Sequence, residues 1–146
     1  MKNAYCYDEE NYTQVFDDVD PSEMEGSTTY EVEVRYPSQQ SIFLKMTAMS
    51  PENALERIFA QFNAGSGQEC WQFTNAKVRS LSVFDFVRID RQWYQCASVG
   101  WKKATLKDLQ DLEDAVDEEM KKQPSYQRSA WAAIQEVMWQ KRKALA

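Results

Sequence analysis

The sequence predicts an α+β fold in a single domain, with an N-terminal ββα unit, a central antiparallel β-hairpin and a C-terminal αα-hairpin. Three observations predict this class. Apolar residues alternate with a period of two in residues 28–36, which is typical of a half-buried strand. Two short apolar-aromatic runs flank a polar tripeptide within residues 84–96, as in a hairpin. Apolar residues recur at helical spacing in residues 105–143, which indicates two amphipathic helices.

Length and composition are those of one globular domain. A chain of 146 residues buries roughly 68% of its unfolded surface on folding, and a hydrophobic content of 43% is enough for a core. No run approaches the ~18 consecutive apolar residues of a membrane span, and the N-terminus has no signal-peptide pattern. Three widely spaced cysteines, Cys6, Cys70 and Cys96, do not indicate a disulfide framework. We therefore expect a cytoplasmic protein that does not bind a membrane.

The net charge of −6 is distributed unevenly along the chain. Residues 1–34 carry ten acidic residues and one lysine, whereas residues 35–104 carry nine basic and five acidic residues. Residues 105–146 carry seven basic and eight acidic residues. The middle of the chain is thus basic within an acidic protein. A basic middle can hold phosphates, and an acidic tail can repel them or cover that surface.

Residues 1–27 are predicted to form an acidic N-terminal arm, and residues 28–146 the α+β domain. Acidic residues cluster at 8–10 and 17–20, and proline and glycine steps at 21–22 and 26–27 break regular structure. Aromatic residues within the arm leave a second interpretation open. In that interpretation residues 10–16 form a short helix or strand against the body of the protein.

The ββα unit comprises strands at residues 28–36 and 42–47 and a helix that starts at Pro51. Ser50 is the expected N-cap, Pro51 suits the first helical position, and Glu52 favours the positive end of the helix dipole. Gly65 is a suitable residue after the helix end. The predicted apolar stripe of the helix consists of Ala54, Leu55, Ile58, Phe59 and Phe62.

Residues 71–79 are predicted to be irregular or a strand that leads into the hairpin. The hairpin has strands at residues 84–89 and 93–96, joined by the loop Asp90-Arg91-Gln92. A buried cysteine acting as a small hydrophobic residue is the expected role of Cys96, with a reactive thiol as the alternative.

Two C-terminal helices are predicted at residues 105–122 and 125–143, joined by a tight turn at Pro124. Thr105 and Asp108 have the spacing of a capping box. The inward stripe of the first helix is predicted to be Leu106, Leu109, Leu112, Val116 and Met120. That of the second is predicted to be Tyr126, Ala130, Trp131, Ile134, Val137, Met138 and Leu145.

Catalytic and cofactor motifs are missing from the sequence. The chain has no histidine, which removes Ser-His-Asp and Cys-His catalysis and most zinc sites. The glycine pair at 65 and 67 lacks the context of a nucleotide-binding loop. The spacing of Asp18, Asp20 and Ser22 resembles the start of a calcium loop, but Glu23 and Thr29 stand where that loop needs glycine and glutamate. We therefore expect a protein that is not an enzyme and uses no cofactor and no metal.

The hairpin is the first candidate binding surface. Basic residues interleave here with the aromatic residues Trp93, Tyr94 and Trp101; they are Arg79, Arg88, Arg91, Lys102 and Lys103. Arg88, Arg91 and the three aromatic residues are the expected contact residues. Basic and aromatic side chains in this arrangement bind phosphates and stack on bases, and they also form hot spots at protein interfaces. The alternative is that the indoles belong to the core and the basic residues are merely solvated.

The helix at 105–122 carries the second candidate surface. Asp111, Asp114 and Glu118 lie on one face of it at helical spacing. Such a face is either solvated charge or a row of negative charge that mimics the phosphates of DNA.

One stretch resembles a known family. Ser80-Leu81-Ser82-Val83-x-Asp85-x-Val87, Trp93-Tyr94-x-Cys96 and Val99-Gly100-Trp101 together resemble the YodL-like segment of small phage, plasmid and conjugative-element proteins. The resemblance covers about 22 of 146 residues, and Phe84 stands where the family pattern has glycine. It implies an accessory protein of a mobile element and supplies no catalytic residues.

These observations together predict a non-catalytic binding protein of a phage or plasmid. Its expected partner is a host protein or protein complex, such as a restriction or CRISPR defence system. The alternative is a nucleic-acid-binding accessory protein that uses the basic-aromatic hairpin.

Overall fold

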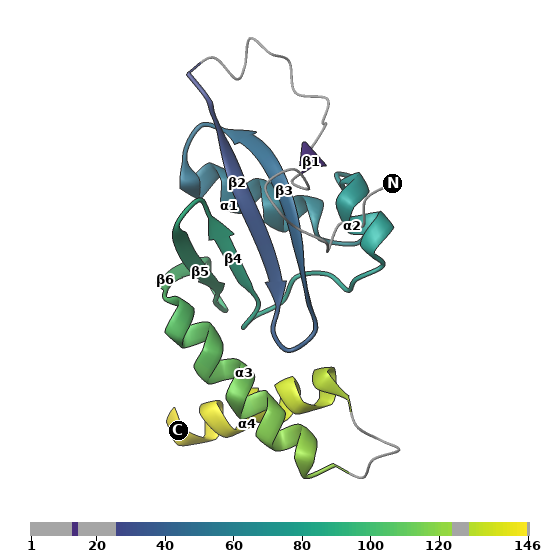
Figure 1. Cartoon of the computed structure of the whole chain (residues 1–146), viewed down its shortest axis with the longest axis vertical. Coiled ribbons are helices and arrows are strands. Elements are labelled where there is room, and N and C mark those ends of the chain that lie inside the picture. Colours follow the sequence, from purple (N-terminus) through teal and green to yellow (C-terminus); the bar gives the residue numbers. More distant parts are fainter. Residues whose placement is uncertain (1–12, 15–25, 124–128, 146) are drawn as a thin grey trace.

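The computed structural model describes residues 13–14, 26–123 and 129–145, and the side chains of residues 26–123 and 129–141. The predicted α+β class is confirmed (Figure 1). The strands are β1 (Thr13–Gln14), β2 (Thr28–Tyr36), β3 (Gln40–Ala48), β4 (Phe86–Ile89), β5 (Gln92–Cys96) and β6 (Trp101–Ala104). The helices are α1 (Pro51–Gln61), α2 (Trp71–Ala76), α3 (Leu106–Lys121) and α4 (Ala130–Leu145).

The strands form one mixed sheet in the order β1-β3-β2-β4-β5-β6. Neighbours from β3 to β6 are antiparallel, and β1 pairs in parallel with β3, Thr13 lying opposite Leu44. β1 lies within residues 10–16, where a short strand was one of the two expectations for the arm. The rest of the predicted arm, residues 1–12 and 15–25, lies outside the described residues.

The sheet has a core on each face, because side chains alternate between its faces along every strand. Val32, Val34 and Tyr36 of β2 point to the face that α1 and α2 cover. Phe86 and Trp93 point to the opposite face, where α3 and α4 pack near the β4–β6 end of the sheet. The two helix pairs therefore occupy different faces and different ends of the sheet (Figure 1).

The start of α1 follows the sequence signals. The Ser50 side chain accepts a hydrogen bond from the Asn53 amide at 3.0 Å, and Pro51 occupies the first turn. Ala54, Leu55 and Ile58 are buried. Phe59 was expected to face the core with the rest of the stripe. It is 39% exposed instead, and its ring contacts Trp101 of β6.

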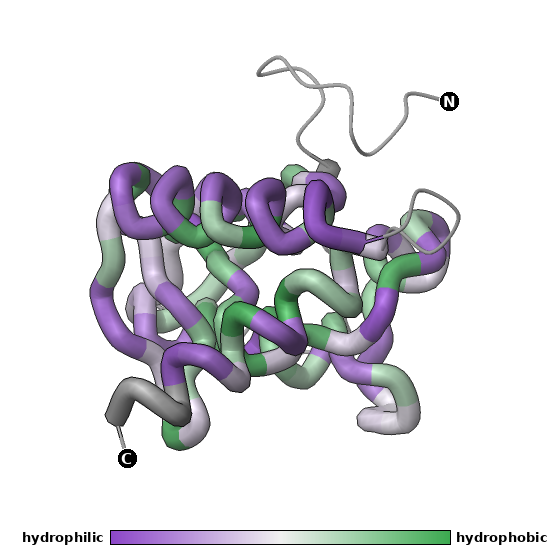
Figure 2. The backbone as a smooth tube through the Cα atoms, turned by 90° about the horizontal axis from the view of Figure 1, so that it is seen from below, coloured by the Kyte–Doolittle hydropathy of each residue, from purple (hydrophilic) through white to green (hydrophobic). Residues whose placement is uncertain are grey.

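The C-terminal helices cross beneath the sheet. Thr105 and Asp108 form the predicted capping box, each side chain accepting a hydrogen bond from the other's backbone amide. In Figure 2 most of α3 is hydrophilic and its hydrophobic residues recur at intervals. Leu106 was expected to face inward but is exposed, because the buried stripe of α3 begins only at Leu109. No helix among the described residues is long and apolar enough to cross a bilayer.

Of the inward residues predicted for α4, Ile134, Val137 and Met138 are buried, and Ala133 joins them. Trp131 is partly exposed instead, with its ring stacked on a guanidinium group. The predicted contacts of Tyr126 and Leu145 lie outside the described side chains.

Three local expectations were wrong. Residues 71–76 are helical rather than irregular or extended, because Phe73 packs edge-on against Phe62 at 5.6 Å between ring centroids. The hairpin loop is shorter than expected, since Gln92 already pairs with Ile89. The expectation also missed β6, which a turn ending at Gly100 brings back beside β5.

Phe84 adopts a backbone conformation that favours glycine. Its φ is +80°, and the Asp85 amide donates to the Ser82 carbonyl at 3.0 Å across the turn. A positive φ at the third residue is the mark of a type II turn, where glycine is the usual residue. The structure thus has a tight turn at the position where the YodL-like pattern has glycine, although the residue here is a phenylalanine.

Replacing Phe84 by glycine is expected to give a more stable protein than replacing it by alanine, by about 1 kcal/mol. Both variants lose the ring, and only alanine keeps the steric conflict of a Cβ at positive φ. Urea unfolding of the two variants measures the difference. Ala60→Gly in α1 is the control. At position 60 glycine is expected to be about 1 kcal/mol less stable than alanine, the reverse of the order expected at position 84. Equal stability of Phe84→Gly and Phe84→Ala contradicts the strained turn.

Candidate functional site

A groove of about 870 Å³ separates α1 from the β5–β6 end of the sheet. It forms because α1 packs on β3 and β4 and leaves space above β5 and β6. The ring of Phe59 on α1 contacts Trp101 of β6 across this space. The groove continues to the turn before β4 and the turn between β5 and β6. Its lining consists of Glu52, Leu55, Glu56, Phe59, Leu81, Ser82, Val83, Tyr94, Cys96, Ala97, Ser98, Gly100, Trp101 and Lys103.

The two walls of the groove follow from the periodicities of a strand and a helix. On the sheet, Cys96 lies opposite Trp101 and Tyr94 lies opposite Lys103, so all four side chains share one face. On α1, positions 52, 55, 56 and 59 recur at three- and four-residue spacing and therefore line one side of the helix. The two walls thus combine apolar and aromatic side chains with the charged residues Glu52, Glu56 and Lys103.

The aromatic centre of the groove is the contact between Phe59 and Trp101. Their rings meet edge to face, with centroids 6.4 Å apart and planes at 85°. Phe59 is exposed and Trp101 is half-buried, so both present ring surface to the groove. Partly exposed aromatic pairs of this kind supply large contact area at low entropic cost.

Tyr94 contributes a protonated hydroxyl to the floor. Burial raises the pKa of the Tyr94 phenol, and the negative charge of Glu52 raises it further. At neutral pH the group is therefore neutral. It adds a polar, uncharged group to the lining of the groove.

Cys96 is held as a neutral thiol. Burial raises the pKa of this thiol to about 11, with the Asp85 carboxylate as a second cause. A nucleophilic cysteine needs the opposite, a lowered pKa beside a cation. The groove therefore offers contact surface rather than a thiolate nucleophile.

Alkylation of native Cys96 by iodoacetamide is expected to be slow at pH 8 and to accelerate as the pH rises toward 11. Only the thiolate reacts with iodoacetamide. Because the pKa of the Cys96 thiol is raised to about 11 in the folded protein, the thiolate fraction becomes large only as the pH approaches that value. Mass spectrometry of peptides after timed labelling measures the rate, and labelling in urea supplies the unfolded reference. Rapid native labelling at pH 7 contradicts a raised pKa.

An ion pair between the half-buried Arg79 and the buried Asp85 fixes the turn before β4. Arg79 donates two hydrogen bonds to Asp85, at 2.6 and 2.8 Å, and the Ser82 amide donates a third at 2.8 Å. The Arg79 guanidinium also lies over the rings of Tyr36 at 4.8 Å and Trp131 at 4.2 Å. Burial raises the pKa of the Asp85 carboxyl, and Arg79 and the Ser82 amide oppose that rise. This cluster joins the sheet, the turn and α4.

The structure separates the residues predicted for the hairpin surface. Tyr94 and Trp101 lie in the groove, whereas Trp93 is 9% exposed and belongs to the core on the opposite face. Arg88 is half-buried and pairs with Glu33 at 3.4 Å. Arg91 is exposed in the turn between β4 and β5. For Trp93 the core alternative is therefore correct, because successive residues of a strand point to opposite faces.

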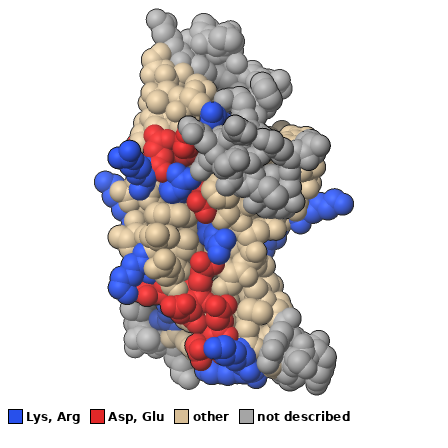
Figure 3. Space-filling model, in the orientation of Figure 1, with Lys and Arg blue, Asp and Glu red and all other residues tan. Residues whose placement is uncertain are grey.

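The acidic residues predicted for α3 remain on the surface. Asp111 and Glu118 pair with the exposed side chains of Lys107 and Lys121 on their own helix, and Asp114 is exposed between them. Figure 3 shows acidic side chains gathered in the lower half of the molecule with basic ones at their border. Exposed helical pairs of this type contribute little to stability.

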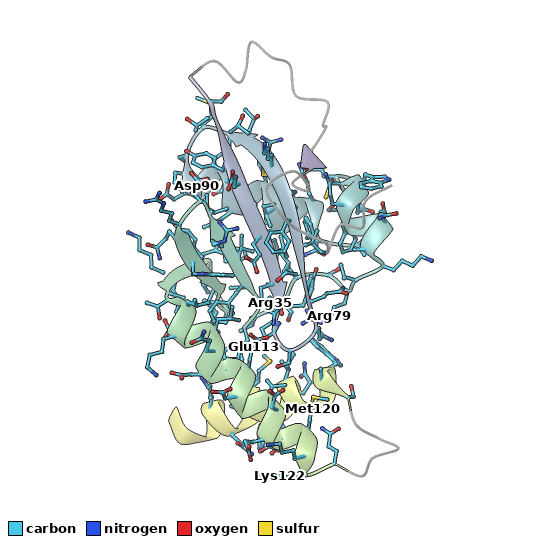
Figure 4. All side chains as sticks on the ribbon, viewed as in Figure 1. Arg35, Arg79, Asp90, Glu113, Met120 and Lys122 are labelled. Atoms are coloured by element: carbon cyan, nitrogen blue, oxygen red, sulfur yellow. The ribbon has the colours of Figure 1, made fainter. Side chains whose placement is uncertain are left out.

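Glu113 is an acidic residue of α3 that the sequence did not single out. Its carboxylate accepts hydrogen bonds from the Arg35 guanidinium and the Ser38 amide, both at 2.5 Å, and so ties α3 to the β2–β3 turn. Figure 4 shows Arg35 and Glu113 meeting at the junction of sheet and helix. No pattern distinguishes Glu113 from its acidic neighbours in the sequence.

Sequence analysis placed no binding surface on Glu52, Glu56 or Phe59, whereas Lys103 was among the basic residues of its candidate hairpin surface. The only signal for the three α1 residues was the edge of the predicted apolar stripe of α1, where Phe59 stands. Pairing α1 with β6 requires the order of the sheet, which the sequence does not reveal. No group of three or more cysteine, aspartate and glutamate side chains able to hold a metal occurs among the described residues. Comparison of the chain with protein-family models, curated proteins and solved structures gave no match.

Proposed function

We propose that this chain is a non-catalytic binding protein that receives part of a protein partner in the groove between α1 and β5–β6. The groove carries this proposal, because it combines an exposed aromatic pair with charged residues of both signs. Glu52 and Glu56 line it from α1, and Lys103 lines it from β6. An aromatic anchor surrounded by polar residues is the composition of interface hot spots.

The geometry favours a protein segment over a small molecule. A volume of about 870 Å³ lies in the range of both kinds of ligand. The groove, however, runs beside the last strand of the sheet and past Val99, an apolar side chain that is 91% exposed at the β5–β6 turn. An exposed apolar tip next to a groove extends the contact surface beyond the reach of a compact ligand.

The proposed biological role is that of a phage or plasmid accessory protein which blocks a host defence complex, such as a restriction or CRISPR system. The resemblance of residues 80–101 to the YodL-like segment motivates this role. The positive φ of Phe84 supports it, since the turn expected of the family's glycine is retained. The turn also lines the groove through Ser82 and Val83, which places the resembling stretch at the candidate site.

Nucleic-acid binding through the hairpin remains the competing function. Arg79 and Arg88 each pair with an acidic side chain, Asp85 and Glu33 respectively. Neutralised arginines release few phosphate counterions, and non-specific affinity for nucleic acid rests on that release. These pairs therefore favour the protein partner.

Capture from host lysate with the immobilised full chain tests the proposed function. The double variant Phe59→Ala/Trp101→Ala is expected to retain about tenfold less of the partner than the unaltered chain. Asp114→Ala, on the acidic face of α3, is the matched surface control and is expected to retain it fully. In host cells the same double variant is expected to lose protection of unmodified phage DNA against restriction.

Two outcomes contradict this function. The first is capture that the groove variant leaves unchanged. The second is salt-dependent binding of DNA or RNA that Arg88→Ala/Arg91→Ala abolishes, which assigns the hairpin to nucleic acid instead.

A further inference from the structure

The last strand of the sheet, β6, has an open edge. Within the part of the chain that the structure describes, β6 pairs with β5 and with no other strand. An open edge presents backbone N–H and C=O groups that can pair with another chain. Proteins use this property when they bind an extended peptide as an added strand.

The hydrogen-bond pattern identifies the residues whose backbone groups face outward. The Ala97 amide donates to the Gly100 carbonyl at 3.0 Å, which makes these two residues a hydrogen-bonded pair. Pairs alternate along an antiparallel ladder, so the next pair, Cys96 and Trp101, turns its backbone groups away from the other strand. By the same alternation the N–H and C=O groups of Trp101 and Lys103 point to the open edge of β6.

The side chains of these two residues also line the groove. Trp101 and Lys103 therefore offer both a backbone edge and a side-chain surface at one place. A strand added beside β6 lies about 4.8 Å away and alternates its side chains between the two faces of the sheet. Every second side chain then points into the space between β6 and α1, toward Phe59.

The lysines of β6 indicate which kind of strand can pair with its open edge. Two of the four residues of β6 are exposed lysines, Lys102 and Lys103. Antiparallel pairing with a second copy of this chain places lysine near lysine, which is unfavourable. Acidic side chains beside Lys102 are favourable, whereas acidic side chains that enter the groove meet Glu52 and Glu56.

We propose that β6 receives an extended segment of a protein partner as a further strand of the sheet. The segment alternates apolar side chains, which fill the groove, with acidic side chains, which lie beside Lys102 on the opposite face. This inference rests on the proposed function and specifies how the groove recognises its partner. The expected chemistry is thus an acidic-apolar alternating peptide in extended conformation.

The probe is a synthetic peptide of about eight residues in which glutamate alternates with leucine, capped at both ends. Its binding to the full, ¹⁵N-labelled chain is followed by amide chemical shifts and hydrogen exchange. Exchange of the Trp101 and Lys103 amides is expected to slow about tenfold or more at saturation. The same peptide N-methylated along the edge that pairs with β6 is expected to lose binding, and methylation along its other edge is expected to preserve it.

Variants of the chain give a second readout. Lys103→Pro removes an outward N–H without breaking a bond to β5 and is expected to weaken the peptide by about tenfold. Lys103→Gln keeps the N–H, so a smaller loss is expected from it. The pair separates the backbone contribution from that of charge, and the methylated peptides carry the test if Lys103→Pro does not fold.

The results distinguish the strand from the groove. Strand addition is overturned if peptide binding survives methylation along the edge that pairs with β6, or if no binding occurs at about 1 mM peptide. Self-association through β6 in sedimentation experiments overturns the assigned occupant. The broader proposal stands or falls separately, with the effect of Phe59→Ala/Trp101→Ala on capture of the partner protein.

Discussion

Replacing Trp93 by alanine is expected to lower the free energy of unfolding by about 3–5 kcal/mol. The Trp93 indole is 9% exposed and meets the ring of Phe86 at 6.3 Å between centroids. It belongs to the apolar cluster that joins β4–β6 to α3 and α4. Its removal leaves a cavity at that junction which the surrounding side chains fill only in part. Urea unfolding followed by circular dichroism measures the change.

Trp139 provides the matched control for this substitution. It is the same residue type on α4, but 59% exposed, and Trp139→Ala is expected to change the stability by about 0.5 kcal/mol or less. A similar loss in both variants contradicts the placement of Trp93 in the core. The contrast with Trp101 is equally informative, because the half-buried Trp101 is expected to affect partner binding more than folding.

Replacing Asp85 by alanine is expected to cost about 3 kcal/mol of stability, because it removes a buried acceptor of three hydrogen bonds and leaves the half-buried Arg79 without this partner. The side chain of Asp85 is 2% exposed and accepts two hydrogen bonds from Arg79 and one from the Ser82 amide. Removing the carboxylate leaves these donors without their acceptor. The turn before β4 and the contact between Arg79 and Trp131 are expected to loosen together, which a change in near-ultraviolet circular dichroism reports.

The exposed pair of Lys107 and Asp111 is the control for Asp85. Asp111→Ala removes an acceptor of the same type from a solvated pair on α3 and is expected to cost about 0.5 kcal/mol or less. A double-mutant cycle with Arg79→Met and Asp85→Leu then isolates the pair itself. Partial recovery of stability in the double variant is expected, since an apolar pair can replace the ion pair but not the acceptor of the Ser82 amide. Equal losses from Asp85→Ala and Asp111→Ala contradict the buried pair.

The Trp93 variant and the groove variants together separate stability from recognition. Trp93 lies inside the protein on the face opposite the groove, so Trp93→Ala is expected to bind the partner normally at temperatures where it remains folded. Phe59 and Trp101 line the groove, so binding is expected to fail there while the fold persists. Trp93, which the hairpin pattern alone places on a binding surface, is thus expected to act in folding.

Much of the local structure was determined by the sequence itself. The alternation in residues 28–36 produces β2, and Ser50 with Pro51 begins α1. The capping box of Thr105 and Asp108 begins α3. These signals are readable because they depend on neighbours within a few residues, where side-chain geometry and backbone hydrogen bonds are set by short-range chemistry.

The tertiary structure alone decided which surface is available. Trp93, Tyr94 and Trp101 look alike in the sequence, yet the first lies in one core and the other two line a groove on the opposite face. β6 becomes an edge strand only because the order of the sheet places β5 on one side of it. The physical reason is that the exposure of a side chain depends on packing between segments far apart in the chain, such as α1 and β6, which no local pattern records.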